Sequence, residues 1–339
     1  MCRGLHTRGG YTWKRSTMDT QRCTSLKPGA LVTLMVLASI CPIFGQPGSP
    51  SDAHPDFEGI WSSSTATPLE RPARLKDKEY FTPQEASQWE RQAAARNRDQ
   101  PVNPDSFASY NALFYEHGTK LAKSLRTSII IEPSDGKLPP LTPAAAAEKT
   151  RRTELLRHPR KAADMGLQDQ CLIFSTAVPM LPYIYNSNFQ IIQTGDSIML
   201  NVEMIHDTRV LRMNRQSHLP PEVRLWLGDS LGHWEGSTLV VDTTNFNDNR
   251  GFFGDAGGIF IYDRNLHVTE RFTLLDAATI LYRFEVDDPT TYTRPWKGEL
   301  TLTRSSSRIF EYACHEGNYA LPDLLRGFRA AESPAPKPR

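Results

Sequence analysis

The sequence lacks an excess of charge of either sign. Its 39 basic residues almost balance its 38 acidic residues, which leaves a formal net charge of +1 over 339 residues. A large nucleic-acid surface would require a basic stripe, and this balance argues against one. The sequence also has no phosphate-cradling glycine loop, no G-x-S-x-G elbow and no dinucleotide fingerprint. We therefore expect no nucleic-acid partner and no cofactor.

The chain has no apolar run suited to a membrane span. The run from Ala30 to about Phe44 is too short and too interrupted for a transmembrane helix. Arg22 and Lys27 precede it, and a charged segment followed by a short apolar one is typical of a secretory signal peptide. We predict a leader over 1–45, with Met18 as an alternative start, and export to the periplasm or the medium. No stable membrane span is expected after cleavage.

Cysteine is scarce. Three of the five cysteines lie in the predicted leader, so its removal leaves Cys171 and Cys314. Two thiols in an exported protein favour a disulfide over a metal site, and two separately buried thiols are the alternative. His315 and Glu316 follow Cys314, but the second histidine of a zinc-protease helix is absent and no further Cys/His pair completes a zinc spacing. No metal site is predicted.

Hydrophobic residues make up only 39% of the chain, whereas prolines number 25. These values predict long surface connections around one core of ordinary size. Before residue 186 the expected elements are few: a strand within 56–64, a helix over 83–97, a strand over 128–132 and a helix from Pro143 to Leu156. Each helix has a threonine before a proline at its first position, which favours a helix start.

From about residue 186 onward the chain alternates as antiparallel strands do. The expected strands are FQIIQT, SIMLNVEMIH, 209–213, GHWEG, TLVVDTTNF, LHVTERFTLL, TILYRFEVDD, WKGELTLTR and RIFEYAC. A short helix is expected over 221–227, and Gly251–Gly258 reads as a loop or lid. An open antiparallel sheet has two edge strands with unpaired backbone groups, and closing the sheet into a barrel pairs these two edges with each other. We predict a mainly β fold, an antiparallel lipocalin-like barrel of about 8–10 strands.

The predicted organisation is one β-barrel domain over 56–330. A linker over 46–55 precedes it, and a charged, proline-rich tail over 331–339 is expected to be disordered. An N-terminal helical, proline-rich arm over about 81–160 is expected to pack against the outside of the barrel or over one end.

Several longer strings carry a family resemblance. HPDFEGIWSSSTATPLERP, RTSIIIEPSDGKLPPLTP, HWEGSTLVVDTTNF, HVTERF, FEVDDPTTYTRPW and YACHEGNY resemble the landmarks of a large exported family of soil-bacterial hypothetical proteins. This resemblance implies export and one integrated domain, and it implies no catalytic residue. More loosely, the opening F-x-G-x-W before an antiparallel meander is similar to lipocalin-type (calycin) barrels.

Two strand faces that are otherwise apolar each carry an ionisable residue. Glu270 shares a face with Leu266, Val268, Phe272 and Leu274, because side chains alternate along a strand. The face that begins at Ile198 leads to His206 in the same way. A carboxylate and an imidazole in one core are costly unless they are paired or used, so these two are candidate catalytic residues, a general acid/base pair. The alternative is structural, with Glu270 bound by an arginine and His206 a satisfied core residue.

Other polar and aromatic residues are weaker candidates. His315 and Glu316 are further catalytic candidates. If the strand through His206 continues straight, Asp207 and Arg209 form a surface ion pair. If it ends at Ile205, all four polar residues of this stretch line the barrel mouth: Glu203, His206, Asp207 and Arg209. Aromatic side chains suited to stacking on a ligand are Trp226, Trp234, Tyr282, Tyr292, Trp296, Tyr312 and Tyr319, although aromatic residues of β-proteins more often belong to the core.

Three functions fit these observations. The leading hypothesis is an exported protein that binds a small apolar or carbohydrate-like ligand inside the barrel. The second is a cofactor-independent hydrolase, lyase or isomerase that uses the His206–Glu270 pair. The third is an envelope interaction module that docks through its proline-rich arm.

Overall fold

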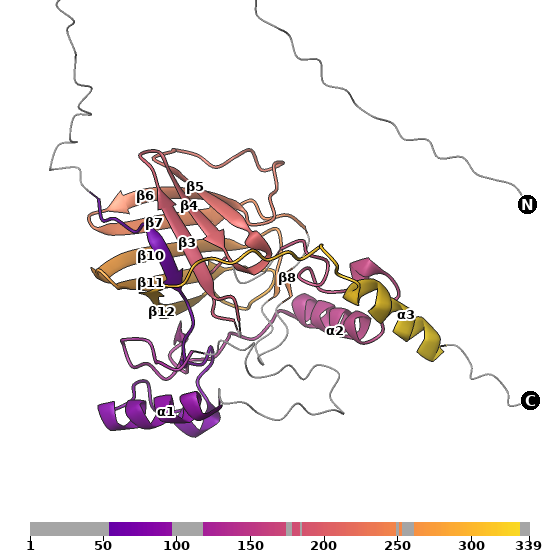
Figure 1. Ribbon diagram of the computed structural model, residues 1–339, viewed down its shortest axis with the longest axis horizontal. Helices are drawn as coiled ribbons and strands as arrows, with labels where there is room; N and C mark the ends of the chain where they lie inside the picture. The colour runs from indigo at the N-terminus through magenta and orange to yellow at the C-terminus, as the bar shows by residue number, and fades with distance from the viewer. Residues whose placement is uncertain are drawn as a thin grey trace, which may run out of the picture. The chain divides into compact units, whose positions relative to one another are not determined.

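Nine β-strands close into a barrel in the computed structural model (Figure 1). Their order around the ring is β1, β3, β4, β5, β6, β7, β10, β11 and β12, and β12 pairs back with β1. The predicted fold class, a mainly β protein with a largely antiparallel barrel of 8–10 strands, is confirmed. The strands of the ring are β1 (Gly59–Ser62), β3 (Asn188–Gln193), β4 (Ser197–Val202), β5 (Thr208–Met213), β6 (Asp229–Glu235), β7 (Thr238–Thr244), β10 (His267–Asp276), β11 (Thr279–Asp287) and β12 (Trp296–Arg304).

The structure describes residues 54–96, 118–173, 178–183, 185–248, 251–252 and 261–332. The predicted leader, nearly all of the predicted linker, most of the Gly251–Gly258 loop and the end of the predicted tail lie outside these residues. Within them, β2 (Ile130–Glu132) pairs with the beginning of β12, and β8 (Gly251–Phe252) pairs with β9 (Ile261–Tyr262) as a separate ribbon.

Strand alternation explains the core. Along β11, Ile280, Tyr282, Phe284 and Val286 are buried, and the residues that alternate with them after Ile280 are more exposed. The other strands of the ring direct apolar side chains inward in the same way, and these side chains form one continuous hydrophobic cluster. The interior of the barrel is therefore occupied by packed side chains, some of them large: Trp61, Phe272, Tyr282, Tyr292 and Trp296 are each at most 2% exposed.

The two longer predicted helices, over 83–97 and 143–156, are present. In α1 (Pro83–Arg96) the side chains of Thr82 and Glu85 bond reciprocally to each other's backbone N–H, which is a capping box. In α2 (Pro143–Arg157) the Thr142 hydroxyl accepts a hydrogen bond from the Ala145 N–H. The sequence rules for helix starts therefore hold at both places.

Three local predictions are wrong. The segment 308–314 is not a strand, because β12 already pairs with β1 and β2 and leaves it no free edge. The segment 221–227 is not a helix, since the Asn245 side-chain amide donates to the Val223 carbonyl, an oxygen that a helix would use. The predicted tail begins too early, because α3 (Ala320–Glu332) continues past Ala330.

The predicted meander fails at one junction. All neighbouring strands of the ring are antiparallel except β5 and β6, which are parallel and share only three register pairs. Parallel neighbours cannot be joined by a tight hairpin, because the chain must return to the starting end of the first strand. The segment 214–228 makes this return.

Candidate functional site

A buried ion pair lies inside the barrel. The Arg209 guanidinium donates to both carboxylate oxygens of Glu270, at 3.1 Å for the Nη1–Oε1 contact, and both side chains are at most 1% exposed. The remaining bonds of Arg209 go to the hydroxyls of Ser230 (2.8 Å) and Thr243 (2.6 Å). The Tyr282 hydroxyl donates to Glu270 Oε1 at 2.7 Å. Glu270 is thus bound by an arginine, which is the structural alternative that the sequence left open.

Arg209 points inward because the chain does not run straight from β4 into β5. A 3-10 turn, η5 (Met204–His206), intervenes, and Ile205 and His206 adopt left-handed backbone angles there, with φ of 58° and 48°. The turn restarts the alternation of faces, so β5 buries Arg209, Leu211 and Met213. The predicted surface pair of Asp207 with Arg209 is therefore wrong, since Arg209 pairs with Glu270 in the interior.

The structure does not bring His206 and Glu270 together. His206 is exposed, and its Nδ1 lies 3.0 Å from the Tyr312 carbonyl oxygen in the segment after β12. Glu270 is fully buried with Arg209 and Tyr282. The left-handed turn that redirects Arg209 also turns His206 out of the core, so the predicted acid/base pair is not formed.

A cavity of about 440 Å3 opens beside the parallel junction of β5 and β6. We call it the seam cavity. Its walls combine apolar side chains with a polar floor, and it is lined by Leu172, Ile173, Asp207, Thr208, Arg209, Val210, Arg212, Leu219, Leu225, Trp226, Leu227, Gly228, Asp229 and Ser230. Trp226 is one of the aromatic residues that the sequence offered for stacking. The volume falls within the range of small-molecule sites, roughly 300–1,000 Å3.

The rim of the seam cavity is unusually apolar for a protein surface. Val210 is 46% exposed, and Leu172 and Leu225 are each 41% exposed. Val223, beside Leu225 on the same segment, is also 41% exposed. Scattered exposed apolar residues need no explanation, whereas contiguous apolar patches are a common feature of interaction sites in proteins.

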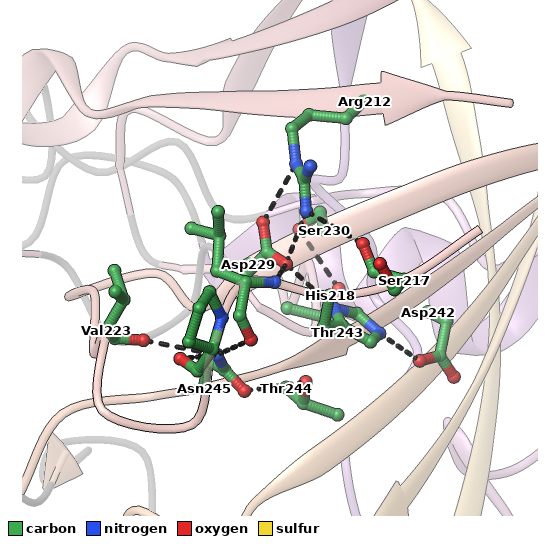
Figure 2. Close-up of polar contacts among 12 residues, drawn as sticks. Arg212, Ser217, His218, Val223, Asp229, Ser230, Asp242, Thr243, Thr244 and Asn245 are labelled. Carbon is green, nitrogen blue, oxygen red and sulfur yellow. Dashed lines mark hydrogen bonds and ion pairs between the residues drawn. The ribbon is translucent and has the colours of Figure 1, made fainter. Parts of the chain in front are cut away.

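A chain of alternating charged groups runs over the outer face of β5, β6, β7 and β10, next to this cavity. We call it the outer ion chain. Figure 2 shows its members Arg212, Asp229, His218 and Asp242. Arg212 donates to both oxygens of Asp229, and His218 Nδ1 lies 2.9 Å from Asp229 Oδ2. His218 Nε2 lies 2.7 Å from Asp242 Oδ1, and His267 Nε2 lies 2.5 Å from Asp242 Oδ2.

These contacts shift the pKa values within the chain. Burial opposes ionisation of Asp229, but the hydrogen bonds from Arg212, the Leu219 N–H and His218 outweigh it and hold the pKa of that carboxyl below its usual value. The hydrogen bond from His267 lowers the pKa of Asp242 against its burial, and His218 adds to the effect. The same bond to Asp242 raises the pKa of His267. Both carboxylates are thus ionised at neutral pH.

The return segment 214–228 is anchored by side chains from the barrel. Asp229 accepts a hydrogen bond from the Leu219 N–H at 2.9 Å. The Asn245 amide donates to the carbonyls of Leu219 (2.9 Å), Pro220 (3.2 Å) and Val223 (3.2 Å), and Figure 2 shows Asn245 between Val223 and Thr244. The segment that supplies five lining residues of the seam cavity is therefore fixed through its polar contacts.

The remaining predicted site residues are dispersed. Glu203 is buried and accepts hydrogen bonds from Asn188 Nδ2 (2.6 Å) and the Phe310 N–H (3.2 Å). Trp234 stacks on His54, with ring centroids 4.4 Å apart. Tyr282 and Trp296, expected to contact a ligand, lie in the packed core.

The segment after β12 holds the other candidates. The predicted disulfide between Cys171 and Cys314 is present. Tyr312 and Glu316 line a second cavity, of about 490 Å3, beside the disulfide. His315 and Tyr319 are exposed, Tyr319 at 72%.

Sequence reasoning missed the outer ion chain. Its members come from β5, the return segment, β6, β7 and β10, and each one alone resembles an ordinary surface residue. The one available signal was the outward position of Asp242 and His267 in two strands that pair with each other.

The residues of the described ranges contain neither a cluster of metal ligands nor a membrane-spanning helix. No three His, Cys, Asp or Glu side chains there are placed to hold a metal ion together. None of the helices in the same ranges has the length and apolar character needed to cross a bilayer. Comparison with protein-family models, curated proteins and solved structures finds no match for this chain.

Proposed function

We propose that this protein binds a small, largely apolar molecule in the seam cavity and that it does so after export. The observation that carries the proposal is the combination of a 440 Å3 cavity with a half-exposed apolar rim. An apolar ligand would cover Leu172, Val210 and Leu225 and remove that surface from water, which is favourable by about 25 cal/mol per Å2. The interior of the barrel is filled by packed side chains, so the seam cavity is the better location for the ligand.

The charges of the lining favour an uncharged ligand. The charged side chains at the cavity are Asp207, Arg209, Arg212 and Asp229, two of each sign. Arg209 is paired with Glu270 and Arg212 with Asp229, so neither offers an uncompensated charge. A single polar group on the ligand would form a hydrogen bond with the polar side chains near Ser230, which lines the cavity.

The Cys171–Cys314 disulfide supports export, because stable disulfides are typical of oxidising compartments. It also joins the segment that carries Leu172 to the chain after β12, so it holds one wall of the seam cavity. An exported carrier of an apolar molecule agrees with both observations.

The proposal predicts binding of a neutral fluorescent probe, N-phenyl-1-naphthylamine, by the full chain. Val210→Glu should weaken this binding about tenfold or more, because it places a charge on the apolar rim. The matched control is Ile192→Glu, since Ile192 is an exposed apolar residue of β3, 37% exposed, and does not line the cavity. Fluorescence titration measures both. Equal effects of the two substitutions, or no binding by the unmodified protein, would contradict the proposed site.

A further inference from the structure

We propose that His218 is a proton-operated latch that controls ligand retention in the seam cavity by fixing the segment 214–228. This inference rests on the proposed function, since it assigns regulation to the same cavity. It follows from the position of one imidazole between two carboxylates, at the start of the segment that walls the site (Figure 2).

The geometry sets the protonation that the closed latch requires. Both ring nitrogens of His218 lie within hydrogen-bond distance of a carboxylate oxygen, at 2.9 Å for Asp229 and 2.7 Å for Asp242. An ionised carboxylate only accepts hydrogen bonds, so both contacts are satisfied only when both nitrogens carry a proton. The neutral ring has one N–H. It therefore leaves one carboxylate facing a lone pair.

The latch connects to the cavity through its immediate neighbours. Leu219 follows His218 in the chain and lines the cavity, as does Asp229. Asp229 Oδ2 accepts from both His218 and the Leu219 N–H, so one carboxylate holds the side chain of the latch and the backbone next to it. Loss of the His218 contact weakens the position of Leu219 and of the wall that continues to Leu227.

The groups around His218 alternate in the sign of their charge. Asp229 and Asp242 contact it directly, whereas Arg212 and His267 occupy the far sides of these carboxylates. Beyond His267 lie two further carboxylates of β11. By element, the charged and titratable groups on the elements around the latch are Arg212 on β5, Asp229 on β6, Asp242 on β7, His267 on β10, and Glu285 and Asp287 on β11; the return segment itself carries Arg215, Glu222 and Arg224.

The direction of the pH response follows from these contacts. His267 has a raised pKa, so its stabilising contribution is complete below the ordinary imidazole pKa of about 6.5 and is lost as pH rises through the raised value. Asp229 and Asp242 have lowered pKa values, so their contributions are present above the ordinary carboxyl pKa of about 4 and are lost as pH falls through the lowered values. The two carboxylates and His267 are therefore charged together in mildly acidic solution, and His267 loses its charge as the solution becomes alkaline.

The test is a titration of N-phenyl-1-naphthylamine into the full chain at mildly acidic and mildly alkaline pH. The dissociation constant of the unmodified protein is expected to rise roughly tenfold from about pH 5.5 to about pH 8.5, since one charge-assisted hydrogen bond is lost. His218→Gln should bind weakly at both pH values, because an amide does not titrate in this range. His233→Gln is the matched control: His233 is an exposed histidine of β6 outside the cavity lining, and this variant should keep the full pH response.

Hydrogen exchange of the unmodified protein without probe gives a second readout. Protection of the Leu219, Leu225 and Gly228 amides, each hydrogen-bonded in the closed segment, should fall between the two pH values after correction for intrinsic rates, while protection in β10 and β11 stays constant. A pH response in His218→Gln as large as that of the unmodified protein, or constant protection of the segment, would overturn the latch, whereas a small residual response is expected from His267. Probe binding that is absent at both pH values, with protection that still changes, would overturn the proposed function and keep the latch.

Discussion

Replacing Glu270 with alanine lowers the free energy of unfolding by about 3–5 kcal/mol, the largest effect expected for a single substitution in this barrel. The substitution leaves the Arg209 guanidinium, at most 1% exposed, without its carboxylate partner. A buried charge without a partner has lost its hydration and gains nothing in return. The Tyr282 hydroxyl loses its acceptor in the same step. Urea unfolding followed by tryptophan fluorescence measures the change.

Two matched variants separate this effect from the loss of any carboxylate. Glu235→Ala removes the partner of Arg271 on the outer face of the barrel, where both side chains are about half exposed. An exposed pair contributes about 0–1 kcal/mol, so this variant should unfold almost as the unmodified protein does. The double variant Arg209→Met/Glu270→Leu should recover most of the lost stability, because no charge remains buried. Equal losses for Glu270→Ala and Glu235→Ala would contradict the buried-pair account.

Removing the disulfide is expected to cost up to about 5 kcal/mol. Cys171 and Cys314 are 143 residues apart in sequence, and the chain-entropy model assigns about this value to a loop of that length. The double variant Cys171→Ser/Cys314→Ser, compared with the oxidised unmodified protein by urea unfolding, measures the difference. Reduction of the unmodified protein should reproduce the result, and a loss below about 1 kcal/mol by either route would show that residual structure already constrains the unfolded chain.

The sequence was sufficient for the features that depend on local patterns. Alternation of apolar residues identified the strands of the barrel, because one face of each strand is buried. The Thr-Pro pairs at 82–83 and 142–143 located both helix starts. The two cysteines left after the predicted leader formed the expected disulfide.

The site depends on features that such patterns do not report. Arg209 faces inward because two consecutive residues, Ile205 and His206, adopt left-handed backbone angles, and neither is a glycine that would mark such a turn. Assuming a straight strand placed His206 in the core and Arg209 outside it. Both assignments reversed together, because a shift of one residue exchanges the two faces of a strand.

The segment 308–314 shows a second reason why local sequence patterns did not predict the whole structure. Its sequence alternates as a strand does, yet its Phe310 N–H bonds to the Glu203 side chain and its Tyr312 carbonyl to His206. Whether an alternating segment joins a sheet depends on whether an edge is free. That depends on how many strands have already closed the ring, which is a property of the whole chain.

The number of strands in this ring has a consequence of its own. Going once around a closed ring, the strand direction must return to its starting value, so the number of direction reversals between neighbours is even. A ring of nine strands therefore cannot be antiparallel throughout; eight of its junctions reverse direction and one, between β5 and β6, does not. The seam is thus a matter of parity, and no substitution in the strands can convert that junction into a hairpin. Only the gain or loss of a whole strand would allow every junction of the ring to be antiparallel.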